Sequence, residues 1–229
     1  MPEIDLARST VRELNAALHA LPADTNETQW RVLNPRGQHA VAVGLEQPIS
    51  VDIEGHVGYY CAGMNKLASI TVHGNVGQGV AENMMSGHVR VKGDASQAAG
   101  ATGCGGLLVI EGNASARCGI SMKGIDIVVQ GSVGHLSAFM AQAGNLVVLG
   151  DAGEALGDSI YEARLYVRGA VKSLGADCIE KKLNDQHKQD LRRLLDDAGL
   201  GGQVDINEFR RYGSARKLYH FHIDNVGAY

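Results

Sequence analysis

Apolar residues recur in pairs along the middle of the chain, and each pair stands just before a glycine. Between residues 49 and 177, the positions four and two residues before the glycine are apolar in every case. A spacing of two places both side chains on one face of a β-strand. The pattern therefore predicts a series of short strands that each end at a glycine. The pairs are Val51/Ile53, Ile70/Val72, Val89/Val91, Leu108/Ile110, Ile127/Val129, Leu146/Val148 and Leu165/Val167.

These glycines return every 19 residues, which is the spacing of a stacked repeat. A period near 20 is typical of a solenoid, in which neighbouring coils bury a core that one coil cannot bury alone. We therefore predict an all-β fold, a right-handed parallel β-helix of seven 19-residue coils, with α-helical caps at both ends. The signatures of leucine-rich and calcium-binding nonapeptide repeats are missing. The corner glycines are Gly55, Gly74, Gly93, Gly112, Gly131, Gly150 and Gly169.

Two further columns describe the corners of each coil. The residue after the glycine is mostly of a type that turns a chain and tolerates positive φ, as at Asn75 and Asp94. Seven residues after the glycine only Ala or Gly occurs, which predicts a corner where backbones pass close to one another or to a neighbouring element. That small-residue column is Ala62, Ala81, Gly100, Gly119, Ala138, Gly157 and Ala176.

Helical periodicity outside the repeat predicts the caps. Residues 1–48 read as an N-terminal cap, with a helix over 5–21 that Thr10 and Glu13 can close in a capping box, followed by two short strands around residues 34–37. Residues 49–177 form the β-helix. Residues 178–229 read as a helix over 178–198, opened by a capping box of Asp177 and Glu180, and a tail rich in aromatic residues.

Composition narrows the possible functions. A formal net charge of -4 argues against nucleic acid or an anionic membrane as the main partner. No stretch approaches the 18 apolar residues of a membrane span, and the N-terminus lacks a secretion signal, so we expect a cytoplasmic protein. The four cysteines have no metal-binding spacing and are expected to be buried thiols.

No catalytic motif stands out along the sequence. Nucleophile-elbow and phosphate-loop patterns are absent. His220 and His222 share one face of a possible strand, but this common spacing favours hydrogen-bonded or interface histidines over a metal site. We therefore expect no catalytic, cofactor-binding or metal-binding residue on this chain.

Two groups of residues are candidates for a partner interface. Three residues before each glycine the side chain should point outward, and this column becomes apolar at Val109, Val128 and Val147, with Leu149 and Tyr166 beside them. We favour a docking surface for a partner here, although the chain's own terminal segments could also cover such a ridge. The second group lies in the aromatic tail, which could serve as an interface or pack back on the coils. Its candidate residues are Tyr219, Phe221 and Tyr229.

The Gly-x-x-Gly corners at 55–58, 74–77, 131–134 and 150–153 resemble the GXGXG β-helix domain that closes the large subunit of glutamate synthase. A subunit of formylmethanofuran dehydrogenase also contains this domain. The segments 150–164 and 212–229 are more specifically similar to the separate β-helix subunit of N-methylglutamate synthase.

This resemblance implies a non-catalytic assembly subunit of a complex that makes N-methylglutamate from methylamine and glutamate. It implies two partners, a glutaminase-like amidotransferase subunit and a subunit that carries FMN and an iron-sulfur cluster, and no cofactor on this chain. A subunit of a split glutamate synthase that uses ammonia, a formylmethanofuran dehydrogenase subunit and a free-standing binding module remain as alternatives.

Overall fold

The computed structural model describes residues 1–216 of the chain. Residues 217–229 lie outside the described part, and the interface predictions at Tyr219, Phe221 and Tyr229 stay predictions, as does the interpretation of His220 and His222.

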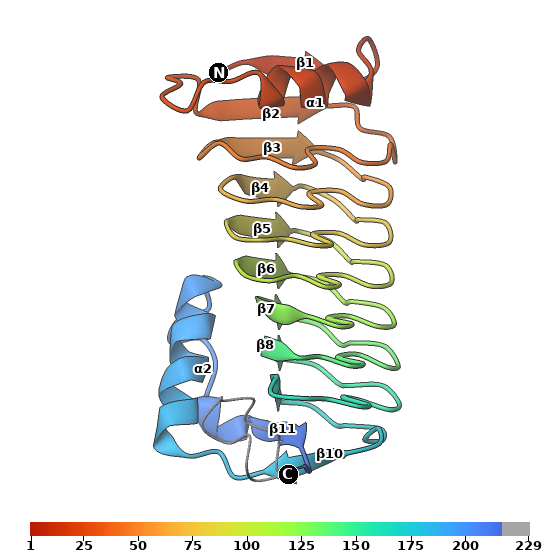
Figure 1. Cartoon of the computed structure of the whole chain (residues 1–229), viewed down its shortest axis with the longest axis vertical. Coiled ribbons are helices and arrows are strands. Elements are labelled where there is room, and N and C mark those ends of the chain that lie inside the picture. Colours follow the sequence, from red (N-terminus) through yellow and green to blue (C-terminus); the bar gives the residue numbers. More distant parts are fainter. Residues whose placement is uncertain (217–229) are drawn as a thin grey trace, which may run out of the picture.

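The described part is a stack of parallel coils with one sheet running along it (Figure 1). Consecutive strands from β2 to β9 pair in parallel, and the predicted inward residues face one another, as Val51 faces Ile70 and Ile70 faces Val89. The predicted β-solenoid is therefore confirmed. The strands are β1 (Glu3–Asp5), β2 (Gln29–Leu33), β3 (Ser50–Glu54), β4 (Ser69–Val72), β5 (His88–Val91), β6 (Leu107–Ile110), β7 (Lys123–Val129), β8 (Ala143–Val148), β9 (Arg164–Val167), β10 (Cys178–Lys181) and β11 (Arg210–Ser214).

The core lies inside the coils and runs along the whole stack. The paired residues of every predicted strand are fully or almost fully buried. A second inward column stands two residues after each glycine and is joined from coil to coil by single bridges, for example between Val57 and Val76. Repetition of these two columns gives each coil the same apolar lining as its neighbours.

The corner glycines from Gly74 to Gly169 are required by close packing and not by positive φ, whereas Gly55 has a φ of +131°. The residue after each glycine has no positive φ. In most coils its side chain instead accepts a hydrogen bond from the backbone of the next coil. Asp94 Oδ1 accepts a hydrogen bond at 2.7 Å from the backbone N–H of Asn113, the equivalent residue of the next coil. Asn113 Oδ1 in turn accepts one at 2.9 Å from Ser132. This ladder occupies the space where a Cβ at the next glycine would lie.

The column of Ala and Gly seven residues after the glycine is a tight corner, as predicted. Ala62, Ala81 and Ala138 adopt φ values of +55°, +55° and +57°, and Gly100 and Gly119 adopt +68° and +70°. Other positions of the same coils hold larger residues at similar φ, such as Leu136 at +55° and Met140 at +52°. The restriction to small residues therefore reflects the buried position, where a Cβ at Gly100 would meet the Ile127 side chain at 2.5 Å.

The ends of the chain differ from the sequence interpretation. Helix α1 (Val11–His19) has the predicted capping box, but it is shorter than expected and follows β1. Residues 40–45 form turns and not a second short strand, since Ala40 and Ala42 have positive φ. Because β2 pairs in parallel with β3, residues 29–48 also continue the coils upward.

The predicted helix over 178–198 is wrong in its first part. Cys178–Lys181 forms strand β10, which pairs antiparallel with β11, and β11 pairs antiparallel with β9. Helix α2 (Asp185–Asp197) begins only after Asn184, whose side chain accepts from the backbone of His187 in a capping box. A short 3-10 helix (Ile206–Glu208) then leads into β11.

Candidate partner interface

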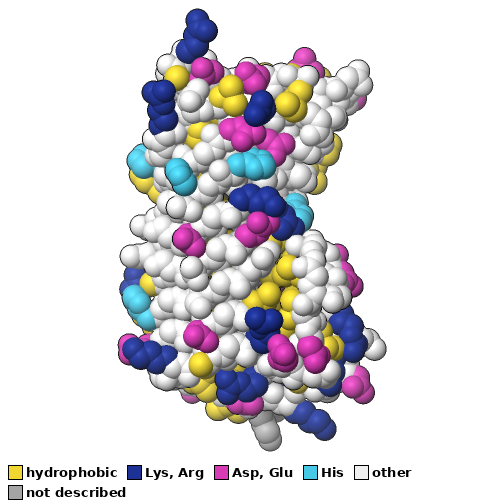
Figure 2. Space-filling view, turned by 180° about the vertical axis from the view of Figure 1, so that it is seen from behind, with side chains coloured by type: hydrophobic (Ala, Val, Ile, Leu, Met, Phe, Trp, Pro, Cys, Tyr) yellow, Lys and Arg dark blue, Asp and Glu magenta, His cyan; other side chains and the backbone are white. Residues whose placement is uncertain are grey.

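The outward apolar ridge predicted as a docking surface is covered by the chain itself. Val109, Val128, Val147 and Tyr166 are 0% exposed and Leu149 is 8% exposed, all in one cluster with residues of α2. Helix α2 lies along β6 to β9, and hydrophobic side chains gather in the seam beside it (Figures 1 and 2). The prediction of a partner on this ridge is therefore corrected, because α2 is its occupant.

The helix covers the ridge with its own apolar stripe. If a partner displaced α2, it would expose Val109, Val128 and Val147 to water. Full exposure would cost about 1.5–3 kcal/mol of burial free energy for each valine side chain. A partner would have to replace all of that burial before it gained anything. The residues that face the ridge are Leu191, Leu194, Leu195, Ala198, Leu200, Ile206 and Phe209.

Polar contacts fix α2 at both ends. At its C-terminal end, Arg90 Nη2 donates a 2.8 Å hydrogen bond to the carbonyl oxygen of Ala198. A cation at this place also complements the helix dipole. Towards the other end, Arg164 Nη1 and Asp190 Oδ2 form an ion pair at 2.9 Å. These contacts hold the helix in a defined position along the strands.

Arg90 also belongs to a charged cluster next to the helix. Glu111 Oε1 accepts from Lys92 Nζ at 2.7 Å and from Arg90 Nη1 at 3.1 Å. Burial alone would raise the pKa of Glu111, but the hydrogen bonds and positive charges of Lys92 and Arg90 outweigh it and lower the pKa. Nearby, burial and then the charge of Arg90 lower the pKa of His88.

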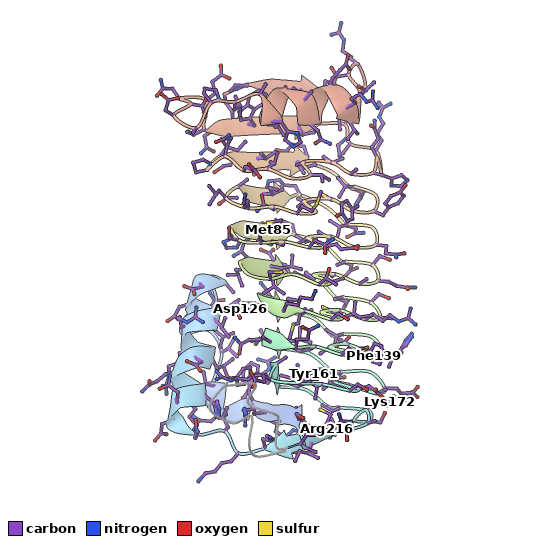
Figure 3. The ribbon with its side chains drawn as sticks, in the orientation of Figure 1. Met85, Asp126, Phe139, Tyr161, Lys172 and Arg216 are labelled. Atoms are coloured by element: carbon purple, nitrogen blue, oxygen red, sulfur yellow. The ribbon has the colours of Figure 1, made fainter. Side chains whose placement is uncertain are left out.

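A polar row crosses the seam beneath the middle of α2. Asn145 Nδ2 donates to Asp126 Oδ1 at 2.7 Å, and Arg193 of α2 lies 3.7 Å from the other oxygen of Asp126. Asp126 is labelled beside the helix in Figure 3. Burial raises its pKa against the opposing contacts of Asn145 and Arg193. This row ties α2 to the sheet.

Cys61, Cys118 and Cys178 are buried as expected, but Cys104 is exposed, which corrects the expectation of four buried thiols. Burial raises the pKa of Cys61 and of Cys118 to about 12, so neither thiol is a ready nucleophile. Within residues 1–216, no three His, Cys, Asp or Glu side chains gather closely enough to hold a metal ion. A hollow of about 480 Å³ lies between Asn145, Glu162 and Arg164, but Arg164 is engaged with Asp190.

A different set of exposed apolar side chains, missed by the sequence analysis, stands just before strands β4, β5, β8 and β9. We call it the methionine edge. Its residues stand nine, eleven or twelve positions after a corner glycine, and because Lys66, Thr102 and Lys123 hold the same positions in other coils, no single column of the repeat marks them. Figure 3 labels two of them, on different coils of the stack. The members, with their exposed fractions, are Met64 (40%), Leu67 (53%), Met85 (48%), Met140 (42%) and Tyr161 (45%).

In the part of the chain that the structure describes, no helix has both the length and the hydropathy to cross a membrane.

Comparison with known proteins gives one relative and no match to a family model or a solved structure. The chain is 64% identical over 229 residues to "Protein GlxC" of Rhizobium meliloti (strain 1021). The alignment spans 100% of both proteins.

Proposed function

The chain belongs to the family of Protein GlxC, and we propose that it serves as the non-catalytic assembly subunit of a glutamate synthase-like complex. In this proposal the complex makes N-methylglutamate from methylamine and glutamate. The β-solenoid holds together a glutaminase-like subunit and a subunit with FMN and an iron-sulfur cluster, and it carries no cofactor itself.

The regular coil is the observation that carries the proposal. The resemblance to the β-helix domain of glutamate synthase implies a parallel coil with glycine corners. The chain forms such a coil, and the paired inward residues of its strands are buried. The corner ladder packs each glycine from Gly74 to Gly169 tightly against the preceding coil. A rigid scaffold of this kind suits the positioning of other subunits better than chemistry of its own.

The methionine edge is the surface that we assign to partner docking. Methionine and aromatic side chains are enriched at protein interfaces, and methionine adapts its shape to the surface opposite. Its members project from coils spread along the stack, so one partner could contact several coils at once. With the ridge occupied by α2, this edge offers a partner five large apolar side chains that are exposed in the described part of the chain.

Co-purification of surface variants tests this proposal. The chain is expressed with the glutaminase-like and FMN-containing subunits, and the amount of each subunit recovered with it is measured. Met85→Asp should weaken assembly by roughly ten- to a hundredfold, or about 1.4–2.8 kcal/mol, because it would bring an unpaired carboxylate into the interface. Tyr59→Asp is the matched control, since Tyr59 is 54% exposed and lies off the edge.

The two variants separate a docking role from general damage. Recovery of both subunits with Tyr59→Asp and their loss with Met85→Asp would support docking at the edge. Full recovery with Met85→Asp would refute the assignment of this surface. Failure of the unaltered chain to bind either subunit would refute the proposed function as a whole.

A further inference from the structure

A hollow of about 480 Å³ lies between two neighbouring coils of the stack. One wall is formed by residues 143–145 at the start of β8, and the other by Glu162 and Arg164 of the following coil. Arg164 Nη1 also pairs with Asp190 of α2. The hollow therefore lies beside that helix, on the strand side of the stack.

The backbone keeps this hollow open. Gly144 has a φ of +95°, and a Cβ there would collide with the backbone oxygen of Ile125 in the preceding coil. Only glycine fits at such a position. Ala143 beside it ends in a single methyl group, whereas Leu67 holds the same position of the repeat in an earlier coil. Residues 143 and 144 therefore contribute no long side chain that would fill the space between the walls.

Opposite charges line the hollow without pairing with each other. Arg164 Nη1 forms its ion pair with Asp190 Oδ2 at 2.9 Å, and not with Glu162, which is exposed two residues before it. A second hydrogen bond, from Gln186 Nε2 to Asp190 Oδ1 at 3.0 Å, holds Asp190 in place. The Arg164 side chain is 44% exposed, and a guanidinium has five N–H donors. The hollow thus presents a cation with donors to spare and, at a separate place, a carboxylate.

Asn145 adds an acceptor that lacks a donor. Its Nδ2 donates to Asp126 Oδ1 at 2.7 Å, and Asp126 is labelled in Figure 3. Within residues 1–216 the buried Oδ1 of Asn145 has no hydrogen-bond partner. A buried acceptor without a donor is unfavourable. Since Asn145 belongs to the wall of the hollow, an N–H donor that enters there can supply the missing partner.

These groups together select the chemical class of a ligand. A simple anion would meet the carboxylate of Glu162, and a simple amine would meet the guanidinium of Arg164, whereas a molecule with both charges satisfies both groups. We propose that the hollow binds a small amino acid. Its ammonium donates to Glu162 and to Asn145 Oδ1, while its carboxylate accepts from Arg164. The whole site lies on this chain, so the inference is independent of the proposed assembly.

Titration of the isolated full-length chain tests the site. Glycine and 4-aminobutyrate carry the two charges at a short and a long separation, and saturation-transfer NMR measures their binding. At least one of them should bind with a dissociation constant on the order of 1 mM, as expected for ligands of so few atoms. Methylammonium and acetate each carry only one of the charges and should bind about tenfold more weakly.

Variants locate the binding in the hollow. Glu162→Gln removes the carboxylate without a change of size and should weaken binding about tenfold. Glu27→Gln is the matched control, since Glu27 is also exposed but lies in the N-terminal part of the chain, and it should leave binding unchanged. Ala143→Leu fills the hollow with an apolar side chain and should abolish binding. Circular dichroism checks that each variant is folded.

Loss of binding in Glu162→Gln together with full binding in Glu27→Gln would support the site, and this comparison decides alone if Ala143→Leu does not fold. The absence of binding by both amino acids would overturn the proposal. Binding that persists unchanged in Glu162→Gln would overturn it too. Equally tight binding of methylammonium or of acetate would show a site for a single charge, which also contradicts the proposal.

Discussion

A methyl group added at Gly112 would enter space that the neighbouring coil already occupies. A Cβ on Gly112 would collide with the side-chain oxygen Oδ1 of Asp94 and would lie 2.7 Å from the backbone oxygen of Gly93. The Asp94 side chain cannot simply move away, since its Oδ1 accepts the 2.7 Å hydrogen bond from the backbone of Asn113. Gly112→Ala must therefore break this rung of the ladder and, because the Gly93 atoms belong to the backbone, also push the two coils apart.

The expected loss follows from the groups involved. A hydrogen bond to a charged acceptor contributes about 1.5–3 kcal/mol, and overpacking costs about 1–3 kcal/mol. Alanine recovers about 0.4–1 kcal/mol because it restricts the unfolded chain. The free energy of unfolding should thus fall by about 3 kcal/mol. For a protein of this size that corresponds to a melting temperature lower by roughly 6–12 °C.

Thermal unfolding followed by circular dichroism measures this effect, with Gly213→Ala as the matched control. Gly213 is buried in β11, yet a Cβ there meets its nearest atoms only at 3.7 and 3.8 Å. The control should therefore change stability by less than about 1 kcal/mol. The double variant Gly112→Ala/Asp94→Ala should cost less than the sum of the two single changes, because both remove the same hydrogen bond. Equal melting of Gly112→Ala and Gly213→Ala would refute the close-packed corner.

Three further predictions concern other parts of the chain. Gly157→Ala should destabilise the fold more than Gly119→Ala. A Cβ at Gly157 would lie 2.8 Å from the Cys178 sulfur, whereas a Cβ at Gly119 would have its nearest atom, the Met122 sulfur, at 3.2 Å. Similar melting temperatures of the two variants would contradict this prediction. Val128→Asp should release α2 and lower the melting temperature of the isolated chain, because the charge would lie under the helix, whereas unchanged protease resistance of α2 would count against it. Glu111→Gln should lower the melting temperature at neutral pH, because only the ionised carboxylate is stabilised by its cationic neighbours. The difference from the unaltered chain should disappear as the pH falls through the lowered pKa of Glu111. A difference that does not depend on pH would disprove the ion pairing.

The sequence predicted the coil because its inward positions repeat without exception. Inward pairs such as Val51 and Ile53 need only local alternation and a fixed period, and both are visible in the chain. The reason for the corner glycines was not visible in the same way. The side chain of Asp94 meets Gly112 of the next coil only in the stacked structure, so the sequence suggested a turn where packing decides.

The ridge could be recognised but its occupant could not. Val109, Val128 and Val147 have the pattern of covered residues, and either a partner or α2 satisfies it. The deciding contacts join distant parts of the chain, such as Arg90 to Ala198. The wrong helix start at 178 has a related cause: pairing of β10 with β11 outweighs the local capping signal, and Asn184 supplies the actual cap.

The most direct test of the proposed function is to titrate this chain into the purified glutaminase-like and FMN-containing subunits and to measure N-methylglutamate formed from methylamine and glutamate. The chain alone should form no product and show no flavin or iron-sulfur absorbance. Product formation should rise with added chain and saturate at a fixed ratio of subunits, in parallel with the mass of the assembly. Equal activity of the two other subunits without this chain would contradict an assembly role, and use of ammonia in place of methylamine would assign it to a split glutamate synthase.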